Sequence, residues 1–179
     1  MKILLTGYEP FGGETINPAL ESVKQLHGLN IAGAKIVSTE LPVVWDDVMP
    51  KFITALEYHQ PDVVISVGQA GGRAKIAPEY IGINLMNGKD NAGVTKVAEP
   101  IAPTGPDGYF ANLPVMQMVA AMNEAHIPAA ISYTAGTYLC NYLAYAVRHH
   151  AVTNKLELKS CFIHIPYLPE QVTDKPANT

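Results

Sequence analysis

The chain has no run of basic residues, and its formal net charge at pH 7 is −4. Nucleic acids and anionic membranes attract clustered Lys and Arg side chains, so neither is an expected partner. The chain also has no apolar stretch of the length that spans a bilayer. The apolar start is too short for a signal peptide and is soon interrupted by Glu9 and Pro10, which favours a cytoplasmic location.

Cysteine is scarce, because the 179 residues include only Cys140 and Cys161. A structural disulfide is not expected in a cytoplasmic chain. Two cysteines without suitably spaced histidines do not supply the ligands of a structural zinc ion, and the sequence predicts neither a metal nor a cofactor. Each cysteine is therefore either a small buried side chain or a reactive thiol.

No repeat, low-complexity segment or linker divides the chain, so we expect one domain over residues 1–179. Short apolar segments alternate with stretches of helical periodicity, a pattern typical of an α/β sandwich with a largely parallel central sheet. The expected strands are Lys2–Thr6, Lys35–Leu41, Asp62–Val67, Tyr80–Asn84, Ala129–Tyr133 and Ser160–Ile165. The expected helices are Pro18–Leu26, Trp45–Tyr58, Pro114–Ala125 and Thr137–His150.

Two local patterns refine this expectation. Asn17-Pro18 predicts an N-cap followed by proline at the first helical position. Residues 87–107 are rich in Gly, Pro and Asn and break the alternation, which predicts a long surface loop. That loop is either a lid or interface element, or a loop without a function.

Cys140 follows an expected strand and lies at the head of the expected helix 137–150. The positive end of the helix dipole favours a thiolate there, and the free amides of the first turn can stabilise an oxyanion. A buried cysteine that fills a gap is an equally good interpretation of the local sequence. Cys161 lies within an apolar strand, which indicates a structural role.

His164 differs from the other five histidines because it ends an expected strand and precedes a proline-rich loop. In α/β folds, site residues gather at the carboxyl ends of the strands. A structural histidine is the alternative. Glu79 precedes the expected strand 80–84 and by itself would be read as a solvent-facing carboxylate. As a third partner of Cys140 and His164, it could hold the imidazole in one tautomer.

Glycine-rich segments follow two of the expected strands, at residues 7–13 and 68–73. Neither matches a phosphate-binding loop, and the first lacks the dinucleotide-binding spacing. We interpret both as walls of a small-molecule pocket, with plain turns as the alternative. Tyr8 and Phe11 beside these glycines would suit a flat, neutral ring.

Five stretches resemble the pyroglutamyl peptidase I family, also called pyrrolidone-carboxylate peptidase, in the family's order. They are LLTGYEPFGGETINP (4–18), SVGQAGGR (66–73), EYIGIN (79–84), SYTAGTYLCN (132–141) and FIHIPYLPEQ (162–171). The resemblance implies a cytoplasmic cysteine peptidase, a homo-oligomer (tetramer or dimer), that hydrolyses the amide bond after an N-terminal pyroglutamyl residue through an acyl-enzyme. It implies a three-layer α/β/α sandwich with a largely parallel, mixed central sheet, and no cofactor.

The resemblance also assigns roles to individual residues. Cys140 would be the nucleophile, His164 the base, and Glu79 the residue that orients the base. The residues in or beside the pyroglutamyl pocket would be Tyr8, Phe11, Asn17, Gln69 and Tyr138.

The sequence departs from the family pattern in several places. Tyr8 and Tyr138 stand where most relatives have phenylalanine, and Tyr80 stands where arginine usually follows the glutamate. The segment after Asn84 is shorter by two residues and offers Lys89 in place of an active-site arginine, although lysine lacks arginine's planar fork of donors. Relatives usually continue past this C-terminus into another helix, so the short C-terminus could weaken assembly.

Two other functions remain open on the sequence. A homologue with impaired catalysis would bind pyroglutamyl groups without turnover. A nucleoside phosphorylase-like enzyme would need arginines near the glycine-rich loops, and the chain offers Arg73 but little else.

Overall fold

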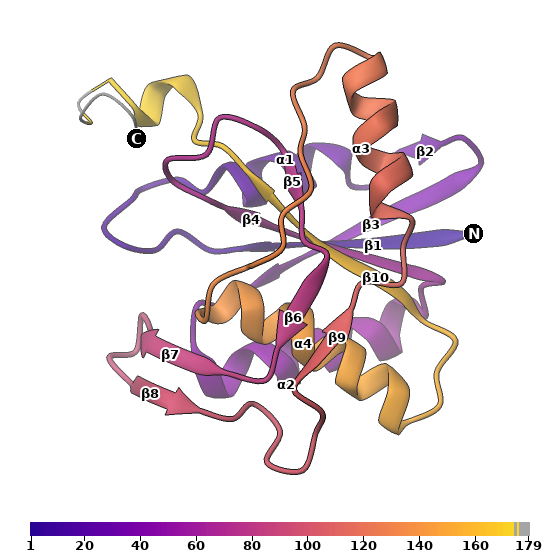
Figure 1. Cartoon of the computed structure of the whole chain (residues 1–179). Coiled ribbons are helices and arrows are strands. Elements are labelled where there is room, and N and C mark those ends of the chain that lie inside the picture. The colour runs from indigo at the N-terminus through magenta and orange to yellow at the C-terminus, as the bar shows by residue number, and fades with distance from the viewer. Residues whose placement is uncertain (174, 176–179) are drawn as a thin grey trace.

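The computed structural model describes residues 1–173 and 175, and its centre is a six-stranded mixed sheet (Figure 1). The strand order is β2 (Asn30–Ile31), β3 (Ala34–Leu41), β1 (Lys2–Tyr8), β4 (Val63–Gln69), β10 (Lys159–Ile165) and β5 (Ala77–Pro78). The four central strands are parallel, and the two short edge strands are antiparallel to their neighbours. The predicted fold class, with a largely parallel mixed sheet, is confirmed.

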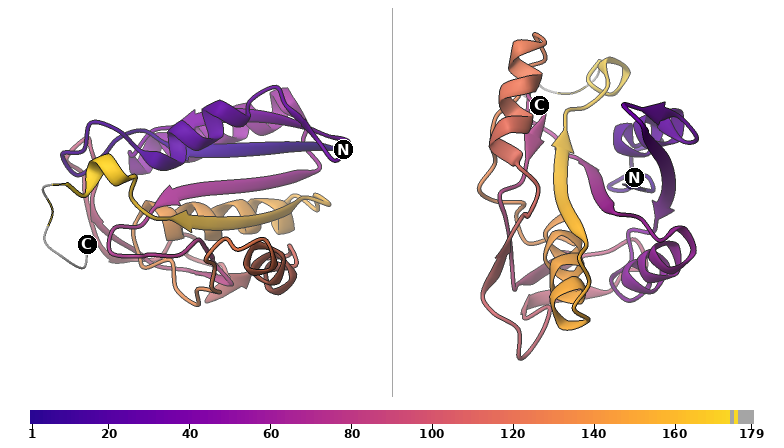
Figure 2. Two further views of the ribbon diagram at one scale, coloured as in Figure 1. Left: turned by 90° about the horizontal axis from the view of Figure 1, so that it is seen from above. Right: turned by 90° about the vertical axis from the view of Figure 1, so that its right-hand side faces the viewer.

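Helices cover both faces of this sheet. Helices α2 (Trp45–His59) and α4 (Leu139–Thr153) pack against each other and on one face, and α1 (Pro18–Leu26) packs on the other. Figure 2 shows the strands between α1 and α4. Helix α3 (Val115–Glu124) packs beside β5, at the edge of the sheet. None of the helices over the described residues is long and apolar enough to cross a membrane.

The central strands are almost continuously apolar because both faces of the sheet are covered. On β1, Leu4 belongs to the core beneath α2 and α4, whereas the adjacent Leu5 belongs to the smaller core beneath α1. Trp45 and Phe52 of α2 are almost completely buried in the larger core. The expected strands of the central sheet and the four expected helices are confirmed to within a few residues at their ends.

The expected strand Ala129–Tyr133 is wrong. This segment runs beside residues 76–80 but makes only isolated bridges, at Ile76 with Ala129 and at Glu79 with Ser132. The bonds between the two segments, among them Ala130 N–H to Ile76 O and Ser132 N–H to Pro78 O, follow a parallel ladder. Between these two bonds, a ladder would need an N–H of Pro78 that donates to the carbonyl of Ala130, and proline has none. The ladder is therefore interrupted at that position.

The region after Glu79 also differs from expectation. Residues 80–84 contribute β6 (Ile81–Ile83), which pairs with β9 (Gly108–Phe110) in a separate ribbon and does not join the central sheet. The expected loop over residues 87–107 contains most of a hairpin, β7 (Met86–Lys89) and β8 (Thr95–Glu99). The buried Asp90 at its turn accepts from the N–H of Trp45 at 3.0 Å, and so fastens the hairpin to the start of α2.

The start of α1 is fixed by Asn17, as the sequence predicted. Its Oδ1 accepts from the N–H of Ala19 at 3.0 Å, and its Nδ2 donates to the carbonyl of Glu9 at 3.1 Å. The side chain is buried, so both bonds are shielded from water. Asn17 thereby joins the first helix to the loop that follows β1.

Replacing Asn17 with alanine removes both hydrogen bonds and should lower the free energy of unfolding by about 1–2 kcal/mol, the usual cost of losing an N-cap. Asn17→Ser keeps an acceptor for Ala19 and should lose less. Urea unfolding measures both, with Gln25→Ala on the exposed face of α1 as the matched control. An alanine variant as stable as the parent would show that the cap does not stabilise this helix.

Candidate active site

His164 and Glu79 form a buried hydrogen-bonded pair. The Nδ1–H of His164 donates to Oε1 of Glu79 at 2.6 Å, and the two residues are only 5% and 2% exposed. The antiparallel pairing of β5 with β10 sets His164 opposite Ala77, and the N–H of Glu79 donates to the carbonyl of Phe162 at 2.8 Å. The edge strand therefore delivers the carboxylate to the imidazole, and Nδ1 is the protonated nitrogen because a carboxylate only accepts.

Cys140, the second residue of α4, faces the same end of the sheet. A Cβ built on Gly68 would lie 3.1 Å from its Sγ, so only glycine leaves room for the sulfur at this point of β4. The parallel register pairs Gly68 with His164, and paired residues of neighbouring strands project to the same face. The thiol and the imidazole thus lie over the same face of β4 and β10, although no hydrogen bond joins these two described side chains.

Arg73 is a further partner of Glu79. Its Nη1 donates to Oε1 of Glu79 at 2.8 Å, and its Nη2 donates to the carbonyl of Thr134 at 3.1 Å. Arg73 and His164 share one carboxylate oxygen, and Oε2 of Glu79 is buried without a hydrogen-bond partner among the described residues. The carboxylate is therefore held by one cation and one imidazole N–H.

Burial raises the pKa of the Cys140 thiol to about 12. The negative charge of Glu79 adds to this rise, whereas Arg73 and the backbone at the head of α4 oppose it. In this geometry desolvation of the sulfur opposes the helix dipole that the sequence analysis invoked, so the helix-head thiolate stays a prediction.

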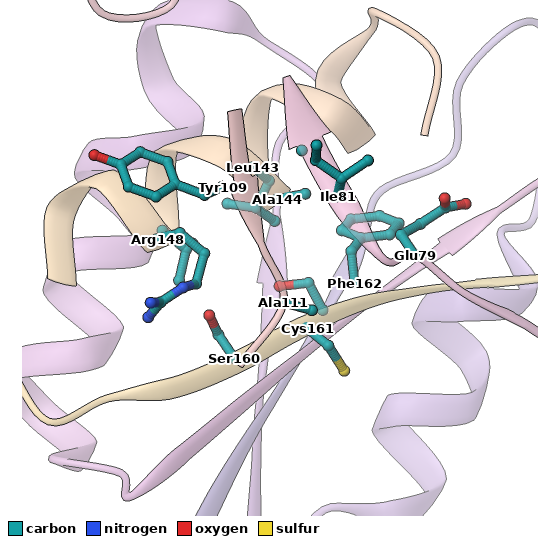
Figure 3. Close-up of a pocket in the computed structure, with 13 residues that line it drawn as sticks. Glu79, Ile81, Tyr109, Ala111, Leu143, Ala144, Arg148, Ser160, Cys161 and Phe162 are labelled. Atoms are coloured by element: carbon teal, nitrogen blue, oxygen red, sulfur yellow. The ribbon is translucent and has the colours of Figure 1, made fainter. Parts of the chain in front are cut away.

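Cys161 has the same raised pKa, about 12, also because of burial. The two thiols differ in access, since Cys140 is partly exposed and Cys161 is buried. Figure 3 shows the sulfur of Cys161 directed away from Phe162 and Glu79, to the other side of β10. This placement agrees with the structural role expected for Cys161.

The cavity drawn in Figure 3 lies between α4, β6 and β10 and includes Glu79 in its wall. Its volume is about 10 Å³, which is about the space that a single water molecule needs. It is too small for a peptide substrate. Within residues 1–173 and 175, no group of three or more His, Cys, Asp or Glu side chains could hold a metal ion.

Three of the expected pocket residues gather around the head of α4. The hydroxyl of Tyr8 donates to the carbonyl of Leu139 at 2.7 Å, and the hydroxyl of Tyr138 donates to the carbonyl of Lys89 at 2.9 Å. The ring of Phe11 lies 6.5 Å from that of Tyr138, centroid to centroid. The hydroxyls of both tyrosines are thus used to fasten neighbouring segments to the helix that carries Cys140.

The other two expected pocket residues direct their side chains elsewhere. Asn17 caps α1, and Gln69 accepts from Nε2 of Gln171 at 2.9 Å. Side chains alternate along a strand, and Gly68 faces the sulfur, so the side chain of Gln69 lies on the α1 face. The backbone of Gln69 is better placed than its side chain to bond to a ligand. Ala70 N–H donates to Ile165 of β10, so the N–H of Gln69 points the other way, toward β1, beyond the last β1–β4 pair.

Several residues that shape the site were not identified from the sequence. Asn141, next to Cys140, is buried and bonds the backbone of Ile83 and Leu85, which fixes β6 against α4. Its signal was a polar residue on an otherwise apolar helix. Gln171 had no such signal. Lys89 is exposed, and its carbonyl accepts from the hydroxyl of Tyr138.

The chain is similar to known proteins over nearly its whole length. The chain matches the family described as pyroglutamyl peptidase over residues 1–179. It is 49% identical to the pyrrolidone-carboxylate peptidase of Levilactobacillus brevis, over 98% of this chain and 86% of that protein. It is 46% identical to the pyrrolidone-carboxylate peptidase of Bacillus subtilis, over 98% of this chain and 83% of that protein.

Solved structures of this kind superpose closely on the fold. The crystal structure of Bacillus amyloliquefaciens pyroglutamyl peptidase I has a TM-score of 0.96 at 45% identity, covering 98% of this chain and 86% of that one. A mutant pyrrolidone carboxyl peptidase from Pyrococcus furiosus has a TM-score of 0.95 at 43% identity, covering 98% and 85%. These matches extend over nearly the whole chain, which therefore belongs to the pyroglutamyl peptidase family.

Proposed function

We propose that this protein hydrolyses the amide bond after an N-terminal pyroglutamyl residue of peptides, with Cys140 as nucleophile, His164 as general base and acid, and Glu79 orienting the imidazole. The observation that carries the proposal is the buried 2.6 Å bond between His164 and Glu79, on the face of the sheet over which the thiol lies. Membership of the family supports the choice of substrate.

Attack on the substrate begins from a neutral thiol. Because burial raises the pKa of Cys140 to about 12, a stable thiolate is not available at neutral pH. His164 must then accept the proton as the sulfur approaches the pyroglutamyl carbonyl carbon. The Nδ1–H bond to Glu79 leaves Nε2 as the basic nitrogen, and the carboxylate stabilises the imidazolium that forms.

The later steps follow from the same arrangement. The free amides at the head of α4 donate to the oxyanion of the tetrahedral intermediate. The imidazolium then protonates the leaving amine as the carbon–nitrogen bond breaks, which gives a pyroglutamyl thioester on Cys140. Water, deprotonated by His164, hydrolyses the thioester and releases pyroglutamate and the thiol.

The residues around the thiol suit a neutral lactam ring. Tyr8 and Tyr138 lie near the sulfur, and the ring of Phe11 lies beside that of Tyr138. The backbone of Gln69, beyond the last β1–β4 pair, can bond to the lactam N–H and C=O. A prolyl substrate lacks the ring carbonyl and would leave a buried donor unpaired, which disfavours it strongly. Asn17 acts through the loop after β1, since both of its polar groups are occupied.

We further propose that the chain acts as one peptidase domain in a cytoplasmic homo-oligomer, either a tetramer or a dimer, with no cofactor. The exposed rings of Phe110 and Tyr133 pack against Tyr80 and form an apolar surface that supports self-association. Arg73, the one residue that had suggested phosphate binding, is bonded to Glu79. The geometry therefore offers nothing that favours a nucleoside phosphorylase-like activity.

Cys140→Ser should abolish release of aminomethylcoumarin from pyroglutamyl-aminomethylcoumarin, with a loss of about 1,000-fold or more, because the alcohol is a far weaker nucleophile in this site. Cys161→Ala, its matched control, should keep the wild-type rate within about threefold. Circular dichroism checks that both variants fold. Full turnover by Cys140→Ser would refute the nucleophile, and a wild type that binds pyroglutamate without turnover would be an impaired homologue.

The raised pKa of Cys140 predicts the pH dependence of its alkylation. A raised pKa moves thiolate formation to higher pH, so the rate of iodoacetamide labelling should rise about tenfold per pH unit from pH 7 to 10, without a plateau. Cys161 should react more slowly throughout because it is buried, and a pyroglutamate analogue should protect Cys140. Peptide mapping by mass spectrometry measures both sites. A plateau reached by pH 7 would mean that the resting sulfur is a thiolate.

A further inference from the structure

We propose that Arg73 is a positioning residue of this active site: it holds the Glu79 carboxylate against His164 and ties it to the segment that leads into the helix of Cys140. The inference rests on the proposed function of these three residues. It concerns a side chain that does not contact the substrate and that acts through Glu79.

The fork of the guanidinium makes this double contact possible. One arm donates to Oε1 of Glu79 at 2.8 Å and the other to the carbonyl of Thr134 at 3.1 Å. Residues 134–138 connect this carbonyl to the start of α4, where Cys140 lies. A single planar side chain therefore fixes the distance between the Glu79 carboxylate and the segment 134–138 that leads to Cys140. Lysine could not donate to both groups in this way.

Charge gives the contact a second role. The side chain of Glu79 is only 1% exposed, and a buried carboxylate needs a compensating cation. His164 also contacts Glu79, but it must be neutral to accept a proton from Cys140. Arg73 can compensate the carboxylate without using the imidazole. Without Arg73, the imidazole of His164 would be the one side-chain donor left to the buried carboxylate among the described residues.

The charge of Arg73 also bears on the thiol. The charged groups that act on Cys140 are Glu79, which raises its pKa, and Arg73, which lowers it. The other titratable groups around the sulfur are His164 and the hydroxyls of Tyr8 and Tyr138. Loss of Arg73 would leave Glu79 unopposed and make the thiol harder to deprotonate. The same substitution therefore removes a support of the base and makes the nucleophile harder to deprotonate.

The chain contains one other arginine, Arg148, which serves as a matched control. It lies on α4, donates to the carbonyl of Leu158 at 3.2 Å, and borders the small cavity of Figure 3. No carboxylate pairs with it among the described residues. In Arg73, by contrast, 32% of the side-chain surface is exposed, so a small cation from solvent can reach the space that its removal would leave.

Arg73→Ala should lower kcat for pyroglutamyl-aminomethylcoumarin about 10- to 100-fold, the cost of one or two charge-assisted hydrogen bonds, and change KM less than about threefold. Guanidinium chloride at tens of millimolar should raise the kcat of Arg73→Ala at least about threefold. The same salt should not accelerate the wild type or Arg148→Ala. Arg73→Lys keeps the charge but loses the fork, so its kcat should lie between those of the wild type and Arg73→Ala.

Alkylation of Cys140 by iodoacetamide at pH 8.5 gives a readout that does not depend on turnover. It should be about threefold slower or more in Arg73→Ala, and guanidinium should restore it. If the wild type did not hydrolyse pyroglutamyl substrates, the proposed function would be refuted. The alkylation rate of Cys140 would still test the role of Arg73. The inference is overturned if kcat stays within twofold of the wild type, if KM rises in place of a fall in kcat, or if guanidinium has no effect. Should Arg73→Ala not fold, Arg73→Lys with wild-type kcat has the same meaning.

Discussion

The hydrogen bond between the buried His164 imidazole and the Glu79 carboxylate is the interaction on which the site depends. It exists because the two-residue edge strand β5 pairs with β10 and carries the chain past His164 before it leaves the sheet. A carboxylate buried to this extent is costly unless its charge is compensated, and Arg73 supplies the cation. The imidazole is then not the carboxylate's only partner, which suits the role of base proposed for His164.

A second constraint is the close approach of α4 to the sheet. Gly68 has no side chain, so the sulfur of Cys140 and the ring of Phe162 can both lie against β4 at this point. The same closeness removes water from the thiol and raises its pKa to about 12. In the proposed mechanism, the burial that positions Cys140 therefore also makes its deprotonation depend on His164. The two halves of the site cannot act separately.

The parts of the fold with a strong local pattern could be predicted from the sequence. The four parallel strands and α1 follow apolar periodicity and an N-cap signal, and these need only neighbouring residues. The error at 129–133 arose because Pro78, about 50 residues earlier in the chain, lacks the N–H that a ladder there would need. The β7–β8 hairpin was missed because its anchor, Asp90, bonds to the distant Trp45.

The site was predictable as a set of residues but not as a geometry. Cys140, His164 and Glu79 stand out through their chain positions and through family resemblance, and the structure joins His164 to Glu79 and places Cys140 over the same face. The contact of Arg73 with Glu79 was not predictable, because both residues lie outside the regular pattern. The effect of burial on the pKa of Cys140 was not predictable either, since a sequence shows the helix terminus but not the depth of burial.

Acid-quench mass spectrometry during turnover of a pyroglutamyl ester tests the central claim most directly. An ester leaving group makes formation of the acyl-enzyme fast, so that its hydrolysis limits the rate and the intermediate accumulates. The account predicts a pyroglutamyl thioester on Cys140 in the wild type. An acyl group on Cys161 or on any other residue, or turnover that proceeds with Cys140 unmodified, would contradict it.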